Sequence, residues 1–217
     1  MVLLDDTAFV SPATALYAIS ATIFNLDLKY MFEMDTLINK SYGGQLQFLT
    51  NLAVAFSYIT VTIGLMGRIL NSQTLIQTKN RFLLIAAPVE VLVSLLYGAI
   101  YIYDVRLLIP EAVDVFLPLH VDFGLHGAPA ILLLIDFLCF SSNWTLNPLM
   151  TLILYANLGL GYWVWVHKTY AMNGYFPYPL LEIVSVQQRL LIFTIAILLM
   201  FSAFLTLRKI HYAIHGP

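Results

Sequence analysis

The chain has 217 residues, of which 60% are hydrophobic and only 10% are charged, and its formal net charge is -2. A surface this poor in charge does not suit a soluble domain, so the composition indicates an integral membrane protein. No block of lysine or arginine is present, which argues against nucleic-acid binding. The single cysteine, Cys139, excludes an internal disulfide and is expected to be buried as a small hydrophobic residue.

Six apolar stretches are long enough to cross a bilayer, because a spanning helix needs about 20 mostly apolar residues. They lie at about 9–28, 46–67, 82–103, 119–140, 148–167 and 189–207. Polar residues, glycine and proline fill the intervals, and no repeat or second domain is visible. The expected fold class is therefore all-α, with residues 1–217 forming a single polytopic domain of six transmembrane helices.

Six spans would place both termini on one membrane face and the loops 29–45, 104–118 and 168–188 on the other. The second and fourth spans both start from the face that holds these loops. At a rise of 1.5 Å per residue, Thr50 and His126 then lie about 8 and 10 Å inside that face. Polar groups within apolar spans are costly and are often functional, so the matched depth predicts a site.

The residue types at this face suit acyl transfer. Asp122 and His126 are four residues apart, or one helical turn, so the carboxylate can orient the imidazole. A histidine held in this way can activate a hydroxyl such as that of Thr50 as a nucleophile. Residues expected to support this site, as further polar groups or as oxyanion donors, are Asn51, Gln47, His167, Glu182 and the backbone N–H groups near Gly43-Gly44.

Each of these polar residues also has a structural interpretation, since a threonine within a span often bonds its own helix carbonyl. In that alternative the chain is a non-catalytic lipid-binding or regulatory membrane protein, and the polar cluster only locks its helices together. Glu90 and Asp136 approach from the opposite face and are expected to pair with each other or with Asn157. His120 and His126 point to different sides of one helix, so neither a metal nor another cofactor is expected.

Five short motifs occur in an order that resembles one known family. They are Tyr42-Gly43-Gly44, Phe48-Leu49-Thr50, Gly124-Leu125-His126, Trp165-Val166-His167, and Tyr178-Pro179 leading to Glu182. Together they resemble the androgen-induced-gene and ADTRP-like (FAR-17a/AIG-type) family of integral membrane threonine hydrolases. The likeness runs from about residue 42 to residue 182.

This resemblance implies an activity, a substrate and a location. It implies cleavage of fatty acid esters of hydroxy fatty acids, with Thr50 as the nucleophile and His126 as its partner. The partners would be this lipid ester and membrane lipids, in the endoplasmic reticulum or another eukaryotic cell membrane. The chain departs from the family's pattern at one place: relatives carry Asn-His-Gly-x-His-Thr where this chain has Asp122-Phe123-Gly124-Leu125-His126-Gly127. The first histidine is lost, which leaves His126 as the working one.

Overall fold

The computed structural model describes residues 11–109, 117–142, 144 and 146–216, and within them the chain forms helices and connecting turns without a strand. The expected all-α class is confirmed. Residues 9 and 10 of the first expected span and residues 110–116 of the expected loop 104–118 lie outside the described residues. The elements are α1 (Pro12–Glu33), α2 (Leu37–Lys40), η1 (Gly44–Gln47), α3 (Leu49–Ile69), α4 (Gln73–Asp104), η2 (Val105–Leu107), α5 (Leu119–His126), α6 (Ala128–Phe140), α7 (Pro148–Asn173), α8 (Pro179–Ile183) and α9 (Val186–His215).

Four helices of the described chain are long and apolar enough to cross a membrane, namely α3, α4 with η2, α7 and α9. Helices α5 and α6 add a fifth span if they are counted as one segment that is bent by 42° at Gly127. Helix α1 is 22 residues long but is not among the spans, because polar residues such as Asn25, Asp27 and Lys29 lower its hydropathy. The six expected spans are therefore not confirmed.

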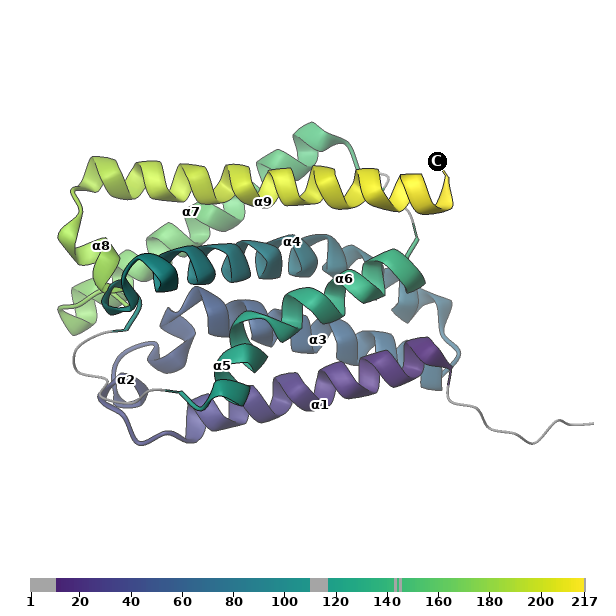
Figure 1. Cartoon of the computed structure of the whole chain (residues 1–217), viewed down its shortest axis with the longest axis horizontal. Helices are drawn as coiled ribbons and strands as arrows, with labels where there is room; N and C mark the ends of the chain where they lie inside the picture. Colours follow the sequence, from purple (N-terminus) through teal and green to yellow (C-terminus); the bar gives the residue numbers. More distant parts are fainter. Residues whose placement is uncertain (1–10, 110–116, 143, 145, 217) are drawn as a thin grey trace, which may run out of the picture.

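The long helices run roughly along one axis, with α1 at one edge of the molecule, α9 at the opposite edge, and α3 and α4 between them (Figure 1). The C-terminal end of α9 and the first turn of α1 lie at the same end of the molecule (Figure 1). The short helices α2 and α8 lie at the other end, where α4 and α7 finish and α9 starts. The expected gathering of three connecting segments at one end is thus seen in the described residues.

Two helix boundaries differ from those expected. Helix α4 starts at Gln73 rather than near residue 82, because the side chain of Ser72 accepts a hydrogen bond from the backbone of Leu75 and caps a polar first turn. Helix α3 starts at Leu49 rather than 46, because Gly43, at a φ of 85°, begins a short 3-10 turn that precedes the helix. Thr50 therefore lies in the first turn of α3 and not five residues inside a span.

The three polar residues that were expected to pair with one another have other partners. Asp136 does not pair with Glu90; its two oxygens accept hydrogen bonds from Lys79 at 2.7 and 2.9 Å. Glu90 accepts a hydrogen bond of 2.7 Å from Ser57. Asn157 donates to the carbonyl of its own helix at Ile153. The expected pairing of Glu90 and Asp136 with each other or with Asn157 is wrong, because Lys79, which precedes the third expected span, lies on the buried face of α4 and binds Asp136.

The expectation for the cysteine is also wrong. Cys139 lies on the outer surface of α6 and is exposed. Its neighbours in the helix explain this, since Asp136 and Phe137 occupy the buried face. In a membrane protein, a small hydrophobic residue on the outer surface can contact lipid and need not be buried within the protein.

Candidate active site

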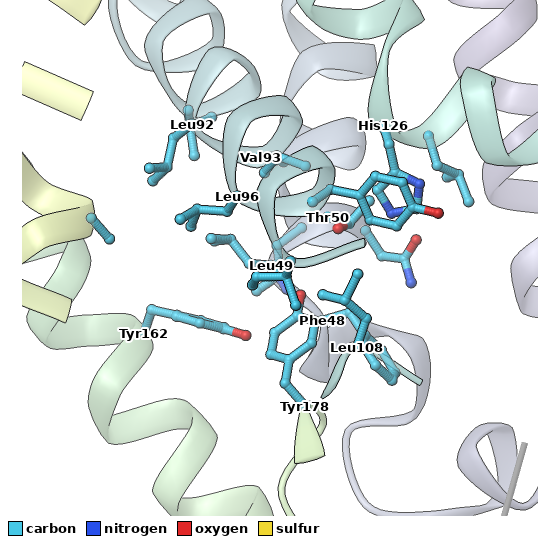
Figure 2. Close-up of a pocket in the computed structure, with 18 of the residues that line it drawn as sticks. Phe48, Leu49, Thr50, Leu92, Val93, Leu96, Leu108, His126, Tyr162 and Tyr178 are labelled. Atoms are coloured by element: carbon cyan, nitrogen blue, oxygen red, sulfur yellow. The ribbon is translucent and has the colours of Figure 1, made fainter. Parts of the chain in front are cut away.

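A cavity of about 900 Å³ lies between α3, α4, α7 and α9 and extends to the end of the bundle where α2 and α8 are found. Most of its wall is apolar. The polar side chains that reach it include Thr50, Asn51, Tyr97, Asp122, His126 and Tyr178. Figure 2 shows Thr50 and His126 in one region of this cavity, with Leu92, Val93 and Leu96 of α4 alongside and Tyr162 on the far side. The topology thus brings the expected hydroxyl and imidazole to one cavity.

His126 is the last residue of α5, and its backbone is held where the helix breaks. Its carbonyl accepts a hydrogen bond of 2.5 Å from the hydroxyl of Ser94 on α4. On the other side of α5, a Cβ built on Gly124 would stand only 2.2 Å from a carboxylate oxygen of Asp27. Gly124 therefore allows α5 to approach α1 closely, which fixes the position of the helix end that carries His126.

The imidazole of His126 is oriented by two side chains. Its Nδ1 lies 3.0 Å from the carbonyl oxygen of Asp122 and 3.1 Å from the carboxylate Oδ1 of the same residue. Both partners are acceptors, so Nδ1 carries a proton and Nε2 is left as the basic nitrogen. The ring of Tyr97 stacks on the imidazole with centroids 3.6 Å apart and an angle of 6° between the planes. The Tyr97 hydroxyl donates to Asp122 Oδ1 at 2.6 Å.

Tyr97 is expected to act as a positioning residue for His126. Tyr97→Phe keeps the stacked ring but removes one charge-assisted hydrogen bond to Asp122, worth about 1.5 kcal/mol. If His126 is the base that the sequence leads us to expect, this variant should lower kcat for ester hydrolysis about tenfold. KM should stay close to its original value, since the hydroxyl holds the base and not the substrate. Tyr103→Phe is the matched control, because Tyr103 is 84% exposed. Steady-state kinetics of the two variants check this, and equal kcat values would contradict the assignment.

Thr50 lies at the start of α3, where backbone N–H groups have no partner within the helix. The N-cap residue, Phe48, supplies no side-chain hydrogen bond. Instead the hydroxyl of Tyr178 accepts a hydrogen bond of 2.9 Å from the N–H of Leu49 and lies within hydrogen-bonding reach of the Thr50 side chain. Burial raises the pKa of Tyr178, so its hydroxyl stays protonated and can donate.

Three of the expected supporting residues lie outside the cavity lining. Gln47 is fully buried and donates to the hydroxyl of Ser41 and the carbonyl of Gly44. His167 bonds the carbonyl of Trp163 in its own helix. Glu182 is exposed on α8. None of the three is therefore placed to act on a group beside Thr50.

Asn51 does line the cavity, but its amide nitrogen is already engaged. It donates to the backbone carbonyl of Gln45 at 3.1 Å and to the side-chain oxygen of Gln45 at 3.0 Å. The N–H of Gly44 likewise donates to the carbonyl of Ser41. These expected oxyanion donors hold the turn before α3 in shape. The sequence offers no signal that separates Tyr97 from the other tyrosines among its 13. Tyr178 belongs to one of the five motifs, but nothing in the sequence places it beside Thr50, which is why both tyrosines were missed as site residues.

The fold and the cavity define an all-α polytopic membrane protein with a largely apolar cavity and a polar cluster at one end of it. Residues 13–212 match the FAR-17a/AIG1-like protein family, and the chain belongs to that family.

The chain is similar to two named proteins. It is 38% identical to a UPF0641 membrane protein of Schizosaccharomyces pombe over 177 residues, which cover 82% of this chain and 79% of the relative. It is 27% identical to the human androgen-induced gene 1 protein over 177 residues, covering 75% and 74% of the two chains. No solved structure matches the chain.

Proposed function

We propose that this protein is an integral membrane hydrolase of lipid esters, with Thr50 as the nucleophile and His126 as the general base. The observation that carries the proposal is the shared cavity: Thr50 and an oriented His126 both line one largely apolar chamber of about 900 Å³. An apolar chamber of this size suits the chains of a lipid, and the polar cluster suits its ester group. The family resemblance supports fatty acid esters of hydroxy fatty acids as substrates and the endoplasmic reticulum as the location.

In the proposed mechanism the hydroxyl of Thr50 attacks the ester carbonyl while Nε2 of His126 takes its proton. The tetrahedral intermediate collapses, the alcohol leaves with the proton from His126, and an acyl ester remains on Thr50. A water molecule then attacks that ester, with His126 again taking and returning the proton. The candidate donor to the developing oxyanion is the Tyr178 hydroxyl, which lies at the start of α3.

Asp122 holds the proton of His126 on Nδ1 and stabilises the imidazolium that forms during each step. Asp122 therefore supplies an acidic group at the position where the family's pattern has asparagine. The structure records no hydrogen bond between Thr50 and His126 within the described residues, and in a hydrolase of this kind such a bond tightens when substrate enters.

The test is covalent labelling. A fluorophosphonate probe incubated with the purified protein in detergent should modify Thr50, and peptide mass spectrometry should locate the adduct there. Prior incubation with a lipid ester should reduce labelling, and Thr50→Ala should remove it. An adduct on another residue, or none on an intact protein, would refute Thr50 as the nucleophile.

A second candidate function is lipid binding without catalysis. The observation that favours it is the contact between the Thr50 side chain and the Tyr178 hydroxyl, which ties the start of α3 to the segment before α8. In that case Thr50→Val would lower thermal stability in detergent, and a fluorophosphonate would leave the chain unlabelled.

A further inference from the structure

The middle of α7 contributes exposed residues to the cavity lining. Three residues of this helix, Asn157, Leu158 and Gly161, line the cavity and are exposed. Gly161 lies near the midpoint of the 26-residue helix, about 20 Å from its first residue. Because α7 is one of the apolar spans, this stretch faces the hydrocarbon core of a bilayer and not the headgroup region.

Hydrogen bonds join helix α7 to the rest of the bundle on either side of this stretch. Tyr155 donates a hydrogen bond of 2.7 Å to the carbonyl of Leu84 on α4. At the other end, Tyr162 donates to the carbonyl of Gln47 at 2.9 Å and Trp165 to that of Leu46 at 2.8 Å. These two hydrogen-bonded positions, Tyr155 and Tyr162, are about 10 Å apart along the helix. The exposed lining residues Asn157, Leu158 and Gly161 lie in the interval between these hydrogen bonds.

Glycine keeps this interval open. A Cβ built on Gly161 would meet nothing within 4 Å, whereas one built on Gly159 would meet Ile197 of α9 at 2.7 Å. Gly159 thus serves the packing of α7 against α9, and Gly161 borders empty space. A larger residue at Gly161 would fill that space without pushing a neighbour aside.

We propose that the interval at Gly161 is a lateral entrance through which the acyl chain of a membrane-dissolved lipid passes from the bilayer core into the cavity. The occupant is a hydrocarbon chain because Gly161 lies near the midpoint of an apolar spanning helix and because the cavity lining is mostly apolar, with Ala53, Phe56 and Leu92 among its residues. The inference deepens the proposed function, since it gives the path by which the ester's chain reaches the site, but lipid entry is measurable without turnover.

The binding test uses palmitic acid that carries a mid-chain diazirine and a terminal alkyne, added to the protein in nanodiscs of dioleoylphosphatidylcholine. Irradiation should attach the probe to cavity residues of α7 and α9. Gly161→Leu should reduce this attachment about tenfold, by filling the entrance. Gly98→Leu is the matched control: Gly98 is also a glycine within a spanning helix whose added Cβ would meet nothing within 4 Å, and it lies outside the cavity lining. Equal attachment in the two variants would overturn the entrance.

A kinetic test separates this inference from the proposed function. For p-nitrophenyl palmitate and p-nitrophenyl acetate, the ratio of kcat/KM values should fall about tenfold in Gly161→Leu relative to Gly98→Leu, because the long chain depends more on the entrance than the short one. An unchanged ratio in an active enzyme would refute the entrance and leave the hydrolase proposal standing. If the protein cleaves neither ester, the hydrolase proposal fails, and the attachment experiment still decides whether lipid enters at Gly161.

Discussion

Thr50→Ala is expected to lower kcat/KM for lipid-ester hydrolysis by at least about a thousandfold. The substitution removes the only oxygen that the proposed mechanism acylates, and alanine leaves no other nucleophile at the start of α3. His126→Ala should cost a comparable factor, because the two groups act as a unit and the loss of either stops the same step. Thr50→Ser should retain measurable turnover, since it keeps the hydroxyl.

A control in the same helix distinguishes loss of chemistry from loss of structure. Thr60 is fully buried and donates to the carbonyl of Phe56 in its own helix. It lies outside the cavity lining, so Thr60→Ala should remain active. Initial rates in detergent, measured beside the apparent Tm of each variant, check these expectations. Turnover that persists in Thr50→Ala of normal stability would exclude Thr50 as the nucleophile.

The coarse architecture could be predicted from the sequence because lipid imposes one strong rule, that backbone polar groups must be satisfied within each segment. Runs of apolar residues therefore indicated helices such as α3, α7 and α9 directly. The apolar run at the start of the chain predicted a spanning helix, but α1 is not among the candidate spans. This helix has one buried face and carries the polar residues Asn25, Asp27 and Lys29. The rule also gave no sign of the bend at Gly127, since Gly127 and Pro129 can lie within a straight apolar stretch as well as at a break.

The candidate site was predicted in part, for a similar reason. One helical turn separates Asp122 from His126, so their pairing follows from local geometry alone. The stacking of Tyr97 on His126 and the approach of Tyr178 to Thr50 join helices far apart in the sequence, and no local pattern encodes them. Two of the expected oxyanion donors, the Asn51 amide and the N–H of Gly44, donate instead to groups in the turn before α3, which no local pattern in the sequence indicates.

Lys79→Met is expected to lower the free energy of unfolding by about 3–5 kcal/mol, the usual cost of leaving one member of a buried ion pair without its partner. Lys79 has no exposed side-chain surface, and Asp136 has 1%. Tyr17 of α1 also donates to Asp136, at 2.8 Å, and Ser141 lies 3.0 Å from the Lys79 ammonium. The network therefore joins α1, α4 and α6, and the variant leaves a carboxylate in the interior with no cation.

The apparent Tm in detergent, at a fixed scan rate, should fall by about 10 °C, given about 2–4 °C per kcal/mol for a chain of this length. Lys29→Met is the matched control, because the Lys29–Glu33 pair is 3.8 Å long with side chains 61% and 67% exposed, and such a pair contributes little. The double variant Lys79→Met with Asp136→Leu should recover most of the loss, since it removes both buried charges together. A Tm for Lys79→Met equal to that of Lys29→Met would show that the buried pair is not what holds α1, α4 and α6 together. Failure of the double variant to recover would show that the stabilisation comes from other contacts of the Lys79 ammonium, such as the Tyr17 ring 5.1 Å away, and not from its pairing with Asp136.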